Sequence, residues 1–325
     1  MNAILQAAKQ TDATAIPVID IGPLRDGSDV AGVAVQLHRA SRDVGFIYVK
    51  NHGIDQTLLD KARTDALDFF HRPTEEKLQS AITEKHRGFL KIGDAVMQDD
   101  VKPDLKESFV WGFEEEDGSV PEDHALRGRN NWPADMPAFR ASALAYFNAA
   151  HGVAYHLMKG FAVGLGLADD FFMTTTDRPL SRASFTYYPP QDVAKDADRF
   201  GVGPHTDFGV LTVLCQDDVG GLQVQDINGD WVTAPPIPGT LVVNVGDLLG
   251  RWTNGRYRST PHRVVNASGR ERLSLVLAYD PNPETVIDAH NVFGAGSPDT
   301  EGAAEPTTCG DYLIWRFGKS FAYRR

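Results

Sequence analysis

Hydrophobic residues recur at helical spacing in three stretches of the first half of the chain. Two of these stretches run from Asp29 to Val44 and from Gln56 to Phe70, and the longest runs from Pro137 to about Gly164. Because residues three and four positions apart share one face of an α-helix, each pattern predicts an amphipathic helix. The longest of them is typical of a helix that covers one face of a sheet.

After Pro179 the hydrophobic period changes from helical to two. Short runs rich in β-branched and aromatic residues then follow one another at 184–188, 202–216, 221–227, 231–234, 240–246, 259–266 and 272–280. Asn228-Gly229 lies between two of these runs and is a strong signal for a tight hairpin. Two more short strands are predicted nearer the N-terminus, at 15–20 and at 46–49. Many short strands at close spacing favour a sandwich or a barrel.

The chain contains no internal repeat and no linker that would divide it, so we predict a single domain over residues 1–325. Helical patterns come first and strands afterwards, which predicts a mainly β fold with flanking helices. Residues 285–308 are rich in glycine, alanine, proline and acidic residues. This composition predicts a mobile loop, followed by an aromatic C-terminal tail.

The charge balance narrows the classes of partner. The chain has 32 Lys and Arg residues against 44 Asp and Glu residues, a net charge of −12. An acidic surface repels phosphate and anionic lipid, so we expect neither nucleic acid nor a membrane as a partner. The cysteines, Cys215 and Cys309, are too few and too far apart for a disulfide scaffold. With no signal-peptide pattern at the N-terminus, these features predict a cytoplasmic protein, for which we favour a monomer.

Candidate metal ligands lie in the β-rich half. His205 and Asp207 are two positions apart in a predicted strand, so both side chains are expected on one face. His262 lies in another predicted strand. Two imidazoles and one carboxylate can hold one face of a metal ion and leave other positions open, which is the ligand set of non-haem Fe(II) oxygenases. A zinc-dependent hydrolase with metal-bound water could use the same residues, and so could a silent metal-binding protein.

The strand predicted at 272–279 adds a second chemical feature. Leu273, Leu275, Leu277 and Tyr279 alternate with Arg272, Ser274, Val276 and Ala278, so one face is expected to pack on helices and the other to face the interior. A buried arginine is costly unless an anion pairs with it. A guanidinium beside a hydroxyl is suited to gripping a carboxylate with two hydrogen bonds, and a 2-oxo diacid would fit if its other end reached the metal. The alternative is an ion pair between Arg272 and Glu271 or another acidic residue.

Together these motifs resemble the isopenicillin N synthase-like family of Fe(II)/2-oxoglutarate-dependent dioxygenases, whose pattern is His-x-Asp, a distant His, and Arg-x-Ser. The resemblance covers most of the chain and implies a double-stranded β-helix, or jelly roll, with N-terminal helices and a long backing helix. It divides the single catalytic domain into an N-terminal dioxygenase region at 14–130 and a catalytic core at 179–283. The stretch 205–222 is especially similar to the ethylene-forming enzyme of bacteria, and the chain is identified as a bacterial member.

The resemblance also implies the site and its cosubstrates. It implies Fe(II) on His205, Asp207 and His262, and 2-oxoglutarate on Arg272 and Ser274. Tyr188 is implied to orient 2-oxoglutarate through its hydroxyl. The implied reaction is the oxidation of a small-molecule substrate by O2, for which we expect hydroxylation, coupled to decarboxylation of 2-oxoglutarate to succinate and CO2.

Alternatives within the resemblance remain open. An oxidase like isopenicillin N synthase or aminocyclopropanecarboxylate oxidase keeps the iron ligands but takes no 2-oxoglutarate. Fragmentation of 2-oxoglutarate, as in the ethylene-forming enzyme, is a second alternative. The sequence does not indicate which residues contact the substrate.

Overall fold

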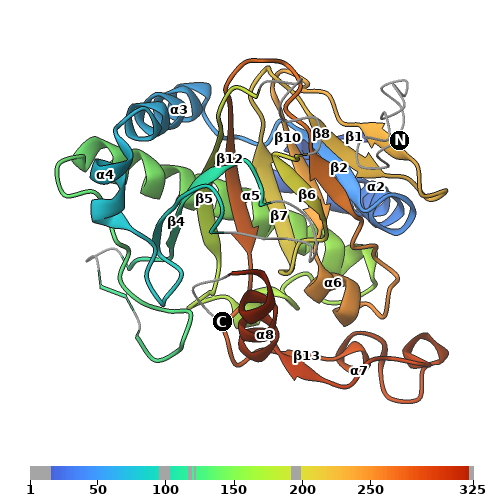
Figure 1. The fold of residues 1–325 in the computed structure, drawn as a ribbon. Coiled ribbons are helices and arrows are strands. Elements are labelled where there is room, and N and C mark those ends of the chain that lie inside the picture. Colours follow the sequence, from blue (N-terminus) through green and yellow to red (C-terminus); the bar gives the residue numbers. More distant parts are fainter. Residues whose placement is uncertain (1–15, 95–102, 116–118, 121, 192–198, 322–325) are drawn as a thin grey trace.

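Two β-sheets form the centre of the molecule in the computed structural model, which describes residues 16–94, 103–115, 119–120, 122–191 and 199–321. The larger sheet has the strand order β1-β2-β10-β7-β12-β5-β4-β3, and the smaller one has the order β6-β11-β8-β9 (Figure 1). The strands of the larger sheet are β1 (Val18–Asp20), β2 (Phe46–Lys50), β3 (Gly88–Leu90), β4 (Glu107–Gly112), β5 (Arg182–Tyr188), β7 (Leu211–Cys215), β10 (Thr240–Val245) and β12 (Arg272–Tyr279). Those of the smaller sheet are β6 (Val202–His205), β8 (Leu222–Gln225), β9 (Trp231–Thr233) and β11 (His262–Val264). This is a double-stranded β-helix core, as predicted.

The space between the sheets is partly filled by a small apolar cluster. It draws Phe46 and Tyr188 from the larger sheet and Val202, Leu222 and Val264 from the smaller one. The cluster holds the two sheets together and leaves room for a cavity beside it.

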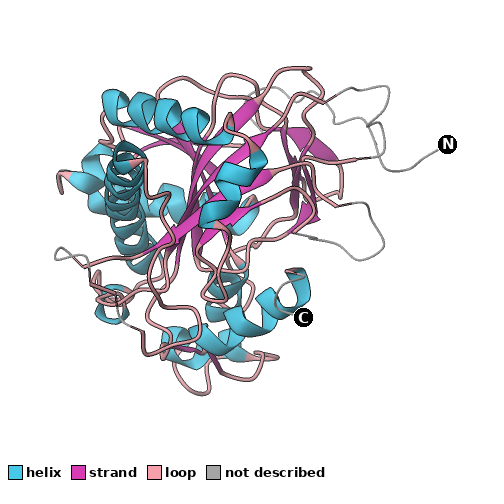
Figure 2. Cartoon of the chain, turned by 60° about the vertical axis from the view of Figure 1, so that its left-hand side comes forward, coloured by secondary structure: helices cyan, strands magenta, loops and turns pink. Residues whose placement is uncertain are grey.

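Three long helices pack together with the outer face of the larger sheet. They are α2 (Val30–Asp43), α3 (Gln56–Phe70) and α5 (Pro137–Gly164), and their bounds agree with the predicted ranges. Figure 2 shows the helices gathered mainly on one side of the strands. The buried Tyr146 on α5 donates a hydrogen bond to the carbonyl of Leu275 on β12 at 2.8 Å, which joins the long helix to the sheet. The alternation predicted for β12 is confirmed, because Leu273, Leu275, Leu277 and Tyr279 belong to the same core cluster as α5.

Shorter elements connect these parts. They are α1 (Gly22–Arg25), α4 (Thr74–Lys77), η2 (Leu78–Ser80), η3 (Met173–Thr175) and α6 (Asp247–Trp252). Among the described residues, no helix has both the length and the apolar character needed to cross a bilayer. The predicted hairpin is confirmed: β8 and β9 pair antiparallel, and Gly229 between them has φ +85°, a conformation that glycine adopts easily.

The segment predicted as one run at 202–216 is two strands in different sheets. β6 ends at His205 in the smaller sheet, and β7 begins at Leu211 in the larger one. Asp207 therefore lies in the crossing between the sheets rather than in a strand with His205. The hydrophobic pattern could not distinguish one bent run from two strands, because the sheet that each half joins is set by long-range pairing and not by local composition.

The prediction of a mobile loop at 285–308 is wrong. This segment contains β13 (Val286–Ile287), α7 (Ala289–Phe293), η4 (Pro298–Thr300) and β14 (Thr307–Thr308), and β13 pairs with β14. It leads into α8 (Cys309–Ser320), which buries Cys309, Leu313 and Phe317 and lies at one end of the sheets (Figure 1). Composition misled here because side-chain caps, such as that of Asp288 on α7, order a glycine-rich segment without a hydrophobic pattern.

One partly buried histidine makes stability depend on pH. His151 on α5 stacks on Phe147, with ring centroids 5.7 Å apart, and contacts Tyr279 at 4.8 Å. Burial lowers the pKa of His151 to about 4, whereas an unfolded chain protonates near pH 6.5. The unfolded state then binds more protons between these values, so the free energy of unfolding falls as pH drops through this window, by on the order of 3 kcal/mol from this residue.

The variant His151→Phe tests this contribution, because it keeps an aromatic ring in the same place without a titrating group. We expect the free energy of unfolding, measured by urea denaturation, to fall less between pH 7 and pH 4.5 in this variant than in the wild type. An equal fall in both proteins would contradict the assignment to His151.

Candidate active site

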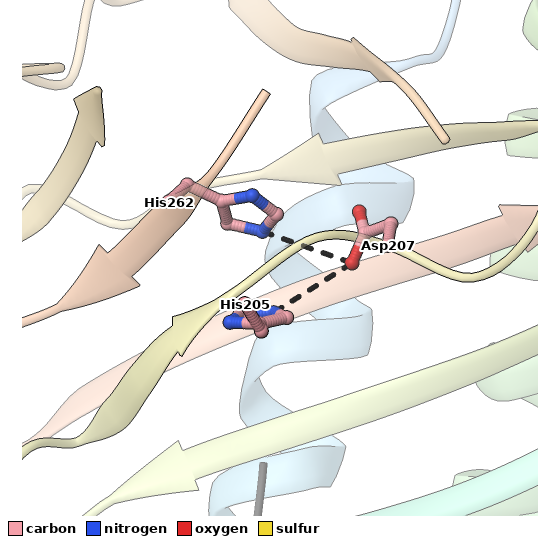
Figure 3. Close-up of side chains that lie close together, drawn as sticks. All are labelled: His205, Asp207 and His262. Carbon is pink, nitrogen blue, oxygen red and sulfur yellow. Dashed lines mark ion pairs between the residues drawn. The ribbon is translucent and has the colours of Figure 1, made fainter. Parts of the chain in front are cut away.

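The predicted metal ligands converge where the two sheets meet (Figure 3). His205 at the end of β6 pairs in register with His262 at the start of β11, and their ring centroids are 4.2 Å apart. Asp207 Oδ1 lies 3.7 Å from Nε2 of each histidine. The candidate ligand atoms all lie within 4.8 Å of one another, a spacing that could hold one metal ion.

Backbone carbonyls fix how the two imidazoles face this point. His205 Nδ1 lies 2.8 Å from the carbonyl oxygen of Gly203, and His262 Nδ1 lies 3.2 Å from that of Thr260. A proton on each Nδ1 is therefore stabilised by a hydrogen bond, which leaves the lone pair of Nε2 available to a metal. Burial lowers the pKa of His205, and the neighbouring His262 lowers it further, so this ring is neutral at neutral pH.

The larger sheet orients the carboxylate. Thr212 Oγ1 on β7 and Asn244 Nδ2 on β10 both donate to Asp207 Oδ2, at 2.5 Å and 2.7 Å. These two residues are paired in register, so the sheet presents both donors together. Oδ1 is left to face the two histidines. Burial alone raises the pKa of Asp207, but the imidazoles and these hydrogen bonds outweigh it and keep the carboxylate ionised.

A second set of predicted residues lies beside the metal ligands, in a cavity of about 170 Å³ between the sheets. Arg272, the first residue of β12, is 1% exposed, and its Nε donates to the carbonyl of Gly220 at 2.6 Å. Its guanidinium carbon lies 4.6 Å from the ring centre of Tyr188. All six residues singled out in the sequence line this cavity: Tyr188, His205, Asp207, His262, Arg272 and Ser274.

The outer edge of Arg272 has the chemistry of a carboxylate receptor. Nη1 and Nη2 of Arg272 and Oγ of Ser274 are buried and have no hydrogen-bond partner among the described residues. Buried polar groups are normally paired, and an unpaired buried cation is costly, so these atoms fit an anion that completes the site. The ion pair with Glu271 does not form, because Glu271 instead accepts a hydrogen bond from Tyr187 and contacts His71. The residues present therefore fit both Fe(II) and the distal carboxylate of 2-oxoglutarate.

A further hollow adjoins the first cavity and the metal ligands, and it shares Lys106, Asp207 and Val276 with that cavity. One cavity of about 140 Å³ is lined by Arg182, His205, Asp207 and Phe317, among others. A neighbouring cavity of about 140 Å³ is lined by Lys106 and again by Arg182. Because the two cavities share Arg182, His86 and Phe321, we treat them as one space and call it the second chamber.

Sequence reasoning missed Thr212, Asn244 and Arg182. Thr212 and Asn244 are ordinary strand residues whose role depends on the register of β7 and β10, and no local motif encodes that register. Arg182 lies in a strand whose hydrophobic pattern gave no indication that its first residue lines a cavity.

Comparison with known proteins defines the class. The model of the 2OG-Fe(II) oxygenase superfamily matches residues 181–281, and that of the non-haem dioxygenase in morphine synthesis N-terminal region matches residues 16–135. A homoarginine-6-hydroxylase of Glycine max is 34% identical over 311 residues, covering 89% of this chain and 93% of the relative. The 2-oxoglutarate-Fe(II) type oxidoreductase hxnY of Emericella nidulans is 34% identical over 290 residues, covering 84% of this chain and 81% of the relative.

A solved structure that contains alpha-KG has a fold similar to that of this chain. A full-length protein of Neurospora crassa, crystallised in complex with alpha-KG and thymine, superposes with a TM-score of 0.84 at 30% identity, covering 97% of this chain and 99% of that one.

The fold and site are those of an iron- and 2-oxoglutarate-dependent oxidoreductase. The chain belongs to the 2OG-Fe(II) oxygenase superfamily. It is an oxygenase that uses Fe(II), 2-oxoglutarate and O2 to oxidise a small-molecule substrate and converts 2-oxoglutarate to succinate and CO2. These findings favour the main prediction over the zinc hydrolase, the silent metal-binding protein and the oxidase without 2-oxoglutarate.

Proposed function

We propose that the chain hydroxylates a small molecule, with Fe(II) held by His205, Asp207 and His262 and with 2-oxoglutarate held by Arg272 and Ser274. One observation carries this assignment: a buried guanidinium edge and a hydroxyl, both unpaired among the described residues, share a cavity with the three candidate ligands. A metal ion on one side of that cavity and the Arg272 guanidinium on the other would meet the two ends of a 2-oxo diacid.

The residues of the chain bind, orient and exclude water. Bound iron and 2-oxoglutarate supply the activation of O2. Nη1 and Nη2 of Arg272 would hold the distal carboxylate of 2-oxoglutarate, and Oγ of Ser274 would donate a further hydrogen bond to it. Tyr188 covers the guanidinium with its ring, which limits the conformations that Arg272 adopts. Its hydroxyl orients the same cosubstrate. The apolar side chains of Leu222 and Val264 line part of the remaining wall and limit the entry of water, beside the polar Lys106, Ser184 and Thr186.

We also propose a subfamily and a division of the catalytic domain. We place the chain in the isopenicillin N synthase-like subfamily as a bacterial member, with a core like that of the ethylene-forming enzyme, on the motifs quoted above. We also propose one catalytic domain over 1–325, with an N-terminal region at 14–130 and a core at 179–283. The shared sheet supports this, because β2 and β4 from the first region pair with β10 and β5 from the second.

Location and partners follow from surface chemistry. A net charge of −12 and two buried free cysteines support a monomeric cytoplasmic protein that binds neither nucleic acid nor membrane. The relatives support a small-molecule substrate, because one is named for homoarginine and another was crystallised with thymine.

The requirement for 2-oxoglutarate tests the proposed function. In anaerobically loaded Fe(II) protein exposed to O2, we expect oxygen uptake and succinate release only when 2-oxoglutarate is added, even before the substrate is known. The control is the same protein treated with a chelator, which should consume no oxygen. Oxygen uptake that does not depend on 2-oxoglutarate would favour an oxidase of the aminocyclopropanecarboxylate type instead.

A further inference from the structure

The second chamber has one wall of aromatic rings. His86, Phe317 and Phe321 contact one another, with ring centroids 4.6 Å apart for His86–Phe317, 4.6 Å for His86–Phe321 and 5.3 Å for Phe317–Phe321. Phe317 lies on α8 and Phe321 follows it, so the C-terminal segment closes the chamber. Each part of the chamber measures about 140 Å³. A cavity of about 150 Å³ is known to accept benzene, so each part has room for one six-membered ring.

A fixed guanidinium faces this aromatic wall. Arg182 Nη1 lies 3.0 Å from Asp280 Oδ2, and the guanidinium carbon lies 4.8 Å from the ring centre of Phe317. Asp280 is fully buried, and its Oδ1 accepts a hydrogen bond from the backbone N–H of Val210, so Arg182 is anchored from behind. Nε and Nη2 of Arg182 make no hydrogen bond to any residue in the described part of the chain. This edge is therefore available to a ligand, and its geometry is preorganised.

The charged side chains that line the second chamber are mostly cationic. Arg182, Lys91 and Lys106 contribute cationic groups, of which Lys106 also lines the first cavity, whereas the acidic side chain among the described lining residues is Asp207, which is committed to the metal. Asp280 and Asp104, which pair with Arg182 and Lys106, do not line the chamber. A cationic substrate would find no carboxylate here to compensate for the water it loses, whereas an anion would find a guanidinium.

We propose that the second chamber selects a small anionic substrate, a single ring that carries a carboxylate, and that Arg182 binds the carboxylate while the ring lies against Phe317. The inference rests on the proposed function, because it takes the chamber beside the metal ligands as the substrate site. It separates this chain from an enzyme that places a cationic group in this chamber, because such a group would meet Arg182 and Lys106. Arg182 is then a specificity-determining residue.

Three matched probes test the charge preference in the wild type. Benzoate, benzamide and benzamidine have nearly the same shape but are anionic, neutral and cationic at neutral pH. Each is titrated anaerobically into the Fe(II)-loaded protein saturated with 2-oxoglutarate, so that Arg272 is already occupied. We expect benzoate to bind about thirtyfold more tightly than benzamide, and benzamidine not to bind. No binding of benzoate, or equal binding of the three probes, would overturn the proposal.

A paired variant assigns the preference to Arg182. Removing Arg182 alone would leave the buried Asp280 unpaired and endanger folding, so Arg182→Gln is combined with Asp280→Asn. The control is Arg256→Gln with Asp299→Asn, because Arg256 also pairs with an aspartate and stacks on a ring, that of Phe293, but does not line the chamber.

We expect the Arg182 pair to lose the preference for benzoate and the control pair to keep it. A preference that survives in the Arg182 pair overturns the assignment. The titration of 2-oxoglutarate itself separates the two levels of the account. If 2-oxoglutarate fails to bind the wild type, the proposed function fails. If it binds and benzoate does not, only the substrate class fails.

Discussion

Replacing Asp207 with alanine abolishes both Fe(II) binding and succinate release in our account. The variant leaves two imidazoles without the carboxylate oxygen that lies 3.7 Å from both of them. Loss of a group that only orients a metal ligand costs about 10- to 100-fold in affinity, so loss of a ligand itself should cost more than about a hundredfold. The measurement is the dissociation constant for Fe(II) under anaerobic conditions, together with the rate of succinate release.

The control for this variant is Asp218→Ala. Asp218 is exposed and pairs with Arg270 at the surface, so its loss removes one negative charge without touching the cavity. We expect it to bind Fe(II) like the wild type. Equal Fe(II) affinity in Asp207→Ala and the wild type would contradict the ligand assignment.

Replacing Arg272 with glutamine raises the concentration of 2-oxoglutarate needed for half-maximal turnover by about a hundredfold and leaves Fe(II) in place. Truncating one partner of a buried charge pair costs about 2 to 5 kcal/mol, and about 2.7 kcal/mol corresponds to about a hundredfold. The variant should not unfold the free protein, because Nη1 and Nη2 of Arg272 have no partner to lose among the described residues. The requirement is measured from the rate of succinate release as 2-oxoglutarate is varied. In thermal unfolding, one fixed concentration of 2-oxoglutarate should raise the Tm of the variant less than that of the wild type.

The neighbouring Arg270 provides the matched control. It lies two residues away, is exposed, and pairs with Asp218. Arg270→Gln should keep the wild-type requirement for 2-oxoglutarate. An unchanged requirement in Arg272→Gln would instead mean that Arg272 stabilises the cavity wall and does not receive the cosubstrate.

Local patterns were sufficient for the three long helices and for most strands, but they did not predict α8, for which the sequence indicates only an aromatic tail. The bounds of α3 and α5 follow from hydrophobic periodicity, because each helix buries one continuous face. The alternation in β12 likewise placed Arg272 and Ser274 on the interior face, because successive side chains of a strand point to opposite sides. The three metal ligands were predictable as a set because their residue types are chemically unusual together.

Features that depend on strand pairing could not be predicted in this way. The order β10-β7-β12 brings Asn244 beside Thr212, residues 32 positions apart in the numbering (244 − 212), and this pairing orients Asp207. The division of 202–216 into β6 and β7 depends on which sheet each half joins, which is also a long-range property. The order within 285–308 depends on capping and on β13–β14 pairing rather than on a buried face.

The most direct test of the central claim is a crystal structure of the anaerobic complex with Fe(II) and 2-oxoglutarate. We predict a metal ion bound to Nε2 of His205, Nε2 of His262 and Oδ1 of Asp207. We also predict that the distal carboxylate of 2-oxoglutarate lies within hydrogen-bond distance of the Arg272 guanidinium and the Ser274 hydroxyl. A metal bound elsewhere, or a carboxylate that leaves the Arg272 guanidinium unpaired, would contradict it.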